Sequence, residues 1–298
     1  MISGSSLPAP RLWLMRFKSA AIGIGQWPRT TQLFALALLL LYIPVVRDTA
    51  RAWFTDENYA HGVFIFPITA FLIWTQRQAI RRAVPQPTMW GLALLAGGLL
   101  LEIAGYLVPI EFLAMVSLIP VLAGSILLLH GKALWKVVRF PVYFLFFAAP
   151  LPGFFLGKIS VWIQGLSATG SAQSMKLLGY TIVQTGNLID IPGMRLGVEE
   201  ACSGFKKLLA LLAFALLYGY LNRLSPGKRM LLVLVAIPIA IVANILRIMA
   251  LIAVSSAGGL TAFHAVHDWA EVFVLIIAFG MFMLFGKLIG CKTEEPSP

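Results

Sequence analysis

Residues 230–254 read MLLVLVAIPIAIVANILRIMALIAV. This stretch exceeds the roughly 20 apolar residues that a helix needs to cross a bilayer, and Arg247 is its only charged residue. The whole chain is 59% hydrophobic and only 12% charged, whereas a soluble domain carries about 25% charged residues. The stretch and the composition together predict a membrane protein.

Further apolar stretches extend this pattern to about eight candidate spans. The others cover about 31–46, 61–75, 89–108, 111–130, 139–157, 206–222 and 271–288. We therefore expect an all-α, polytopic membrane helix bundle. The predicted organisation is a basic cytosolic tail over 1–30, a transmembrane domain over 31–290 and a cytosolic tail over 291–298. The basic, proline-containing tail lacks the pattern of a cleavable signal peptide, so we expect the first span to be retained.

One internal segment is more polar than its neighbours. Residues 158–205 mix Gln, Ser, Thr, Gly and Asp with scattered apolar residues, which predicts an extracytosolic loop region over the bundle. Within it, 159–178 is expected to form an interfacial helix. The β-branched residues and turn signals of 180–198 predict a short hairpin.

The positive charges indicate an orientation in the membrane. Most lysines and arginines fall in the N-terminal tail, in the loops near 76–88, 130–139 and 222–229, and in the C-terminal tail. The positive-inside rule then places both termini in the cytoplasm. The net charge of +11 is accordingly interpreted as an orientation signal, and a nucleic-acid partner is not expected.

This orientation separates the two cysteines of the chain. Cys202, in EEACSGFKKL, lies at the extracytosolic mouth of the sixth span, and Cys291 lies at the cytosolic end of the eighth. They cannot form a disulfide with each other across a bilayer. An unpaired thiol outside the cytosol is unusual, so Cys202 is a candidate functional residue, although a small interfacial apolar role is the alternative.

The charge inside the span at 230–254 is a second candidate. Arg247 lies roughly 10 Å below the extracytosolic surface at 1.5 Å per residue, where an arginine is costly without a partner and is by default functional. Asn244, three residues earlier, shares its helical face and can orient the guanidinium. A structural ion pair with Glu102 is the alternative.

Histidines complete a candidate catalytic set. His264 and His267 lie in the predicted loop 255–270 on the side of Cys202, and His61 lies on the same side at the second span. A thiolate is a nucleophile, imidazole transfers protons near neutral pH, and a guanidinium can hold an oxyanion. Candidate carboxylates to orient the histidine are Glu199, Glu200, Asp268 and Glu271.

Five stretches in this order resemble the exosortases, multi-span sortase-like enzymes of Gram-negative bacteria. They are ENYAHGVFIFPI, FPVYFLFFAAPLPGF, ACSGFKKLLAL, NILRI and HDWAEVFVL, and the resemblance covers about 52–285. It implies the catalytic residues Cys202, Arg247 and His267. The chain departs from the family pattern at Glu271 and Val272, so His264 remains an alternative.

The resemblance also implies a reaction and partners. A cysteine peptidase or transpeptidase would cleave C-terminal sorting tails of exported proteins and pass on the acyl group. These tails carry a Pro-Glu-Pro signature, a single span and a basic cluster, and such substrates accompany exopolysaccharide genes. The implied location is the bacterial inner membrane with a periplasmic active site. No cofactor and no metal are expected.

Two other functions remain open from the residues. A membrane metalloprotease would use Glu199, Glu200 and the histidines, although Gly204 stands where the Glu-Glu-x-x-x-Arg pattern needs arginine. A transporter or a component of polysaccharide export would line a path with intramembrane Arg and Glu. Transporters often carry inverted repeats, and the chain shows no convincing repeat.

Overall fold

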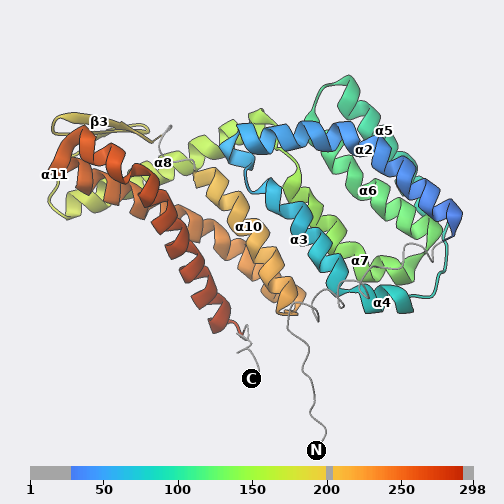
Figure 1. Ribbon diagram of the computed structural model, residues 1–298. Helices are drawn as coiled ribbons and strands as arrows, with labels where there is room; N and C mark the ends of the chain where they lie inside the picture. The colour runs from blue at the N-terminus through green and yellow to red at the C-terminus, as the bar shows by residue number, and fades with distance from the viewer. Residues whose placement is uncertain (1–27, 199–203, 291–298) are drawn as a thin grey trace, which may run out of the picture. The chain divides into compact units, whose positions relative to one another are not determined.

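The computed structural model describes residues 28–198 and 204–290, and the chain is almost entirely helical (Figure 1). Its internal contacts divide it into two compact units, Met1–Pro150 and Leu151–Pro298. The first unit contains α2 (Arg29–Thr55), η2 (Glu57–Tyr59), α3 (Gly62–Thr75), α4 (Arg77–Arg82), α5 (Trp90–Leu107), α6 (Glu111–Leu129), α7 (Lys132–Phe144) and η3 (Leu145–Ala148).

The helices α5 and α6 approach each other closely because glycines line their contact. Gly91, Gly98 and Gly105 recur every seven residues along α5, so they share one face of the helix. A Cβ atom at Gly91 would lie 2.4 Å from the backbone nitrogen of Leu128. Small residues let two helix backbones pack at short range, which is a typical way of joining helices inside a membrane.

This contact gives a prediction about stability. A Cβ at Gly98 would lie 2.6 Å from the Cγ2 atom of Val121, whereas a Cβ at Gly97 would meet nothing within 4 Å. We expect Gly98→Leu to destabilise the protein by roughly 1–3 kcal/mol through overpacking, and Gly97→Leu to have little effect. Thermal unfolding in detergent measures both, and equal melting temperatures for the two variants would contradict the proposed packing.

A buried polar contact joins α2 to α6. The hydroxyls of Tyr42 and Ser117 lie 2.8 Å apart, and the Ser117 hydroxyl donates to the backbone oxygen of Ala114 at 2.6 Å. Both side chains are almost fully buried. At the end of α2, the indole nitrogen of Trp53 donates to the backbone oxygen of Ala148 at 2.9 Å. These bonds satisfy polar groups that would be costly to leave unpaired in an apolar surrounding.

The second unit contains α8 (Gly153–Leu177), β1 (Val183–Thr185), β2 (Leu188–Ile191), β3 (Met194–Gly197), α10 (Gly204–Leu221) and α11 (Pro226–Leu288). The predicted helix at 159–178 lies within α8. The predicted hairpin in 180–198 is extended by one strand, because two tight turns, Gly186–Asn187 and Pro192–Gly193, join three antiparallel strands in the order β1-β2-β3. The described part of the predicted loop region 158–205, residues 158–198, therefore consists largely of regular structure.

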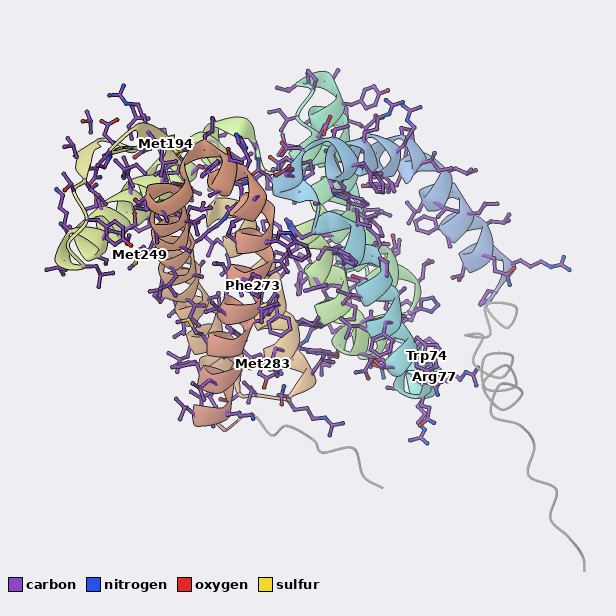
Figure 2. All side chains as sticks on the ribbon, turned by 60° about the vertical axis from the view of Figure 1, so that its left-hand side comes forward. Trp74, Arg77, Met194, Met249, Phe273 and Met283 are labelled. Atoms are coloured by element: carbon purple, nitrogen blue, oxygen red, sulfur yellow. The ribbon has the colours of Figure 1, made fainter. Side chains whose placement is uncertain are left out.

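The last helix, α11, is a hairpin of two arms that meet at Gly259. This glycine alone has non-helical dihedral angles, with φ of 64°, and only glycine adopts such angles without strain. The arms run antiparallel, because the Lys228 amine donates to the Ile289 backbone oxygen at 2.7 Å across 61 residues. Figure 2 shows Met249 on the first arm, 226–258, and Phe273 and Met283 on the second, 260–288.

Two segments differ from what the sequence predicts. The expected loop over 255–270 is helical on both sides of Gly259, so His264 and His267 lie on a helix. The expected fifth span, 139–157, is interrupted: α7 ends at Phe144, η3 ends at Ala148, and α8 begins at Gly153. Pro150 and Pro152 lie in this break, where proline removes the backbone donors that a continuous helix needs.

The helices identify a membrane protein. In the described part of the chain, four helical segments are long and apolar enough to cross a bilayer: Arg29–Thr55, Trp90–Leu107, Glu111–Leu129 and Pro226–His267. A fifth arises if α7 and α8 together form one broken span. The predicted count of about eight spans is not confirmed; α3, for example, has 14 residues and is about 21 Å long, short of a bilayer core of about 30 Å.

Candidate active site

The site is built around a buried arginine on the first arm of α11. Arg247 is 1% exposed, and Asn244, on the same face one turn earlier, is fully buried. Neither the nitrogen nor the oxygen of the Asn244 amide has a hydrogen-bond partner within the described residues. Because a buried amide without a partner is unfavourable, this position is suited to receive a polar group from a ligand or from the segment 199–203.

The second arm brings a histidine to the arginine. The Nη2 atom of Arg247 lies 3.5 Å from the Nε2 atom of His267. A guanidinium can only donate hydrogen bonds, so Nε2 is the acceptor in this contact. The antiparallel course of the arms allows the pairing, because the first arm carries Arg247 before the bend at Gly259 and the second arm runs back beside it with His267.

The two candidate histidines differ in their surroundings. His267 is half-buried and packs against the ring of Phe263 at 5.2 Å between ring centroids, whereas His264 is exposed. They lie three residues apart on α11 and share a face. The sequence left His264 and His267 as alternatives, and the contact with Arg247 favours His267.

A pocket of about 370 Å³ opens beside the histidines. Five of its lining residues are the consecutive residues 194–198 of β3 and its end, and the rest come from both arms of α11, including Ile248, Leu260, Phe263 and His267. Figure 1 shows β3 next to the bend of α11. Most of these walls are apolar, so the pocket suits an apolar group held next to the imidazole.

One ion pair lies at the rim of this pocket. Arg195 of β3 donates through Nε and Nη2 to the carboxylate of Asp190 on β2. The hydrogen bond that Arg195 donates to Asp190 raises the pKa of the guanidinium above its ordinary value. The pair is largely exposed, and exposed ion pairs contribute little stability. Its consequence for the pocket is that Asp190 neutralises the positive charge of Arg195 at the rim.

Cys202 lies outside the described residues, but Val198 and Leu208, on either side of it in the sequence, both pack in clusters with α11. Val198 packs in one buried cluster with Ile248 and Leu251. Leu208 packs in another with Ala240 and Ala243. Arg247 lies between these two groups along the first arm. Val198 and Leu208, which precede and follow Cys202 in the sequence, therefore belong to clusters on either side of the arginine along this arm.

The other sequence-predicted residues are distributed as follows. Glu199 and Glu200 lie outside the described residues, as do the side chains of Asp268 and Glu271.

His61 and Glu102 belong to the first unit, where backbone groups of Phe147 and Asn58 bond to the His61 ring. The supporting role of His61 and the alternative pairing of Glu102 with Arg247 stay predictions. In the described ranges, no three His, Cys, Asp or Glu side chains gather as metal ligands would.

Sequence reasoning missed the contribution of β3 and Phe263 to the site. The pocket depends on the third strand and on the bend at Gly259, and neither was expected. The turn signal Pro192–Gly193 was available for the strand, because a proline followed by a glycine with positive φ is typical of a tight turn. The arrangement as a whole combines a buried cation, an imidazole and an apolar pocket, which suits acid–base chemistry on a carbonyl group.

Comparison with known families agrees with this arrangement. The family model described as Transmembrane exosortase matches residues 53–286, most of the chain. Searches of curated proteins and of solved structures gave no match. The matched range includes the contact between Arg247 and His267, the pocket beside it and the segment that contains Cys202. The chain therefore belongs to the transmembrane exosortase family.

Proposed function

We propose that the protein is a membrane-embedded cysteine transpeptidase that cleaves the C-terminal sorting tails of exported proteins. Membership of the family supports a transpeptidase-type role in the membrane. The observation that carries the proposal is the partly buried contact of 3.5 Å between Arg247 and His267. Val198 and Leu208, the described residues that precede and follow Cys202 in the sequence, pack in the clusters on either side of Arg247 along the first arm.

The proposed reaction begins with the thiol of Cys202. His267 takes the thiol proton on Nε2, which then no longer accepts the hydrogen bond from Arg247 and so releases the guanidinium. The thiolate attacks the scissile peptide carbonyl to form a carbon–sulfur bond. Arg247 then holds the negative charge that develops on the carbonyl oxygen. The Asn244 amide, buried one turn away, supplies a second donor or orients the guanidinium. In this surrounding, away from water, such electrostatic contacts are stronger than at an exposed surface.

The intermediate is resolved in two steps. The carbon–nitrogen bond breaks, and the leaving amine takes the proton from His267, which leaves a thioester on Cys202. An acceptor nucleophile, an amine or water, then gives its proton to His267 and attacks the thioester carbonyl. The thiolate departs and recovers a proton, so the enzyme is unchanged. With an amine the product is transferred, and with water it is released.

The substrate and the location complete the proposal. The substrate tail carries a Pro-Glu-Pro signature, a single span and a basic cluster, and it enters the bundle laterally from the bilayer. The protein lies in the bacterial inner membrane with about eight spans, a periplasmic active site and cytoplasmic termini, in accordance with its distribution of positive charge. Exported proteins associated with exopolysaccharide are the proposed partners.

Co-expression with a tail-bearing protein tests this function. The Cys291→Ala variant, which retains Cys202 as its single thiol, is expected to shorten the substrate. Alkylation by N-ethylmaleimide should block the reaction, whereas a chelator should not. Inhibition by the chelator alone would instead support the metalloprotease alternative, and an uncut substrate would contradict the proposal.

The same assay separates the two histidines. We expect His267→Gln to lower the rate of cleavage by about 10²–10⁴-fold, because it removes the proton-transfer group. His264→Gln should lose less than about tenfold, since its ring is exposed and Arg247 contacts the other histidine. Initial rates of product formation measure both. A larger loss for His264→Gln would reverse the assignment.

A further inference from the structure

The hydrogen bonds of the sheet show which backbone groups of β3 remain available. The Val198 nitrogen donates to the Asn187 oxygen at 3.0 Å, so these residues form a hydrogen-bonded pair. Hydrogen-bonded pairs alternate along an antiparallel ladder, and the register therefore makes Ile189 with Leu196, and Ile191 with Met194, the next such pairs. The backbone groups of Arg195 and Gly197 consequently point away from β2.

The other edge of β3 is free in the described part of the chain. The strand order is β1-β2-β3, so β3 is an edge strand. Within the described ranges, no backbone hydrogen bond joins Arg195 or Gly197 to an element outside the sheet. Unpaired groups on an edge strand form a template for another extended chain.

This free edge borders the pocket beside His267. Successive side chains of a strand point to opposite faces, yet all five residues of 194–198 line the pocket. A pocket that touches consecutive residues of a strand must adjoin its edge. The opposite wall comes from α11, where Phe263 and His267 lie. The edge and the imidazole of the proposed active site thus border one space.

We propose that the substrate segment next to the scissile bond binds in extended form along β3, as a fourth strand of the sheet. Its backbone would pair with Arg195 and Gly197, and alternate side chains would enter the apolar pocket, which is a known way in which proteins bind peptides. A lipid chain or a helix would leave these backbone groups unpaired, which favours an extended peptide. This inference rests on the proposed function, because it assigns how the same site holds its substrate.

Proline substitutions at the two outer edges of the sheet test this docking mode, the binding of the substrate segment along β3. Gly197→Pro removes one N–H group from the free edge and is tolerated in principle at an edge strand. Its reference is Gly197→Ala, which keeps the N–H group and whose Cβ would come no closer than 3.8 Å to a neighbour. Gln184→Pro is the matched control, because the register places its N–H group on the opposite, outer edge of β1.

The binding readout does not require cleavage. In the Cys202→Ala background, a photoreactive benzoylphenylalanine replaces Leu260, which lines the pocket, and a co-expressed, epitope-tagged tail-bearing protein is the probe. We expect Gly197→Pro to lower the crosslinking yield at least tenfold relative to Gly197→Ala, and Gln184→Pro to change it less than twofold. Equal yields for Gly197→Pro and Gly197→Ala would overturn the proposal.

Two further measurements keep the test decisive. If Gly197→Pro does not fold, N-methylation of successive residues in the substrate peptide replaces it. In that case crosslinking should fall at alternate positions, and the absence of a two-residue period would overturn the docking mode. Crosslinking without cleavage by the active enzyme would contradict the proposed function alone. Normal cleavage and crosslinking by Gly197→Pro would contradict the docking mode alone.

Discussion

Cys202→Ala is expected to leave the sorting tail of a co-expressed substrate uncut, with a rate at least about 10⁴-fold below that of the wild type. Removal of the nucleophile eliminates the covalent route, and only binding and oxyanion stabilisation remain. The rate is measured from the appearance of the shortened substrate. The variant should still fold, because alanine is smaller than cysteine and the clusters that anchor 199–203 are unchanged.

The second cysteine supplies the control for this variant. Cys291 lies at the far end of the chain, after α11, and takes no part in the proposed chemistry. Cys291→Ala should therefore keep the activity of the wild type. If Cys202→Ala cleaved the tail at a rate near that of Cys291→Ala, the cysteine mechanism would be wrong, and the metalloprotease alternative would gain support.

Arg247→Lys is expected to lower the turnover rate by about 10²–10³-fold, the usual effect of removing one donor from an oxyanion site. Lysine keeps the positive charge but lacks the planar fork of donors, so one ammonium cannot serve both His267 and the developing oxyanion. Substrate capture by the crosslinking assay should change much less, because the guanidinium acts mainly in the transition state.

A surface arginine shows whether this effect is specific. Arg51 of α2 is exposed and pairs with Asp48 at 3.5 Å, and such a pair contributes little. Arg51→Lys should therefore match the wild type in rate and stability. Arg247→Lys could instead lower the melting temperature and the total activity while each folded molecule keeps the turnover rate of the wild type. That result would show that the buried arginine has a structural role only.

The sequence predicted the apolar helices well where polar or turn residues flank them on both sides. The expected spans 61–75, 89–108, 111–130 and 206–222 differ by at most two residues at either end from α3, α5, α6 and α10. A run of apolar residues fixes the helix, and a change to polar residues marks its end. Whether each helix crosses the bilayer depends on its length and its neighbours, which the pattern alone does not give.

The errors arose at proline and glycine. In FPVYFLFFAAPLPGF, hydrophobicity predicted one span, but Pro150 and Pro152 separate η3 from α8. Between the last two expected spans, 255–270 was predicted to be a loop, but only Gly259 leaves the helical region. One bend was enough to reverse the chain, because the arms of α11 pack against each other and compensate for the lost helical bonds.

The site was partly foreseeable because topology limits which groups can meet. An arginine in a span and two histidines near its end were expected on one side of the membrane, and the structure brings Arg247 to His267. The choice between two histidines three residues apart depends on the rotation of the second arm about its axis. The bend at Gly259 sets that rotation, and no sequence period encodes it.

Disulfide trapping tests most directly whether Cys202 joins this pair. In the Cys291→Ala background, His267→Cys and, as the matched control, Trp269→Cys each add one thiol; Trp269 is an exposed residue of the same arm. A disulfide needs Cα atoms within about 7 Å. Under mild oxidation we expect His267→Cys to couple with Cys202 rapidly, as detected by the mass of the linked peptides. Coupling of Trp269→Cys instead, or of neither variant, would contradict the account.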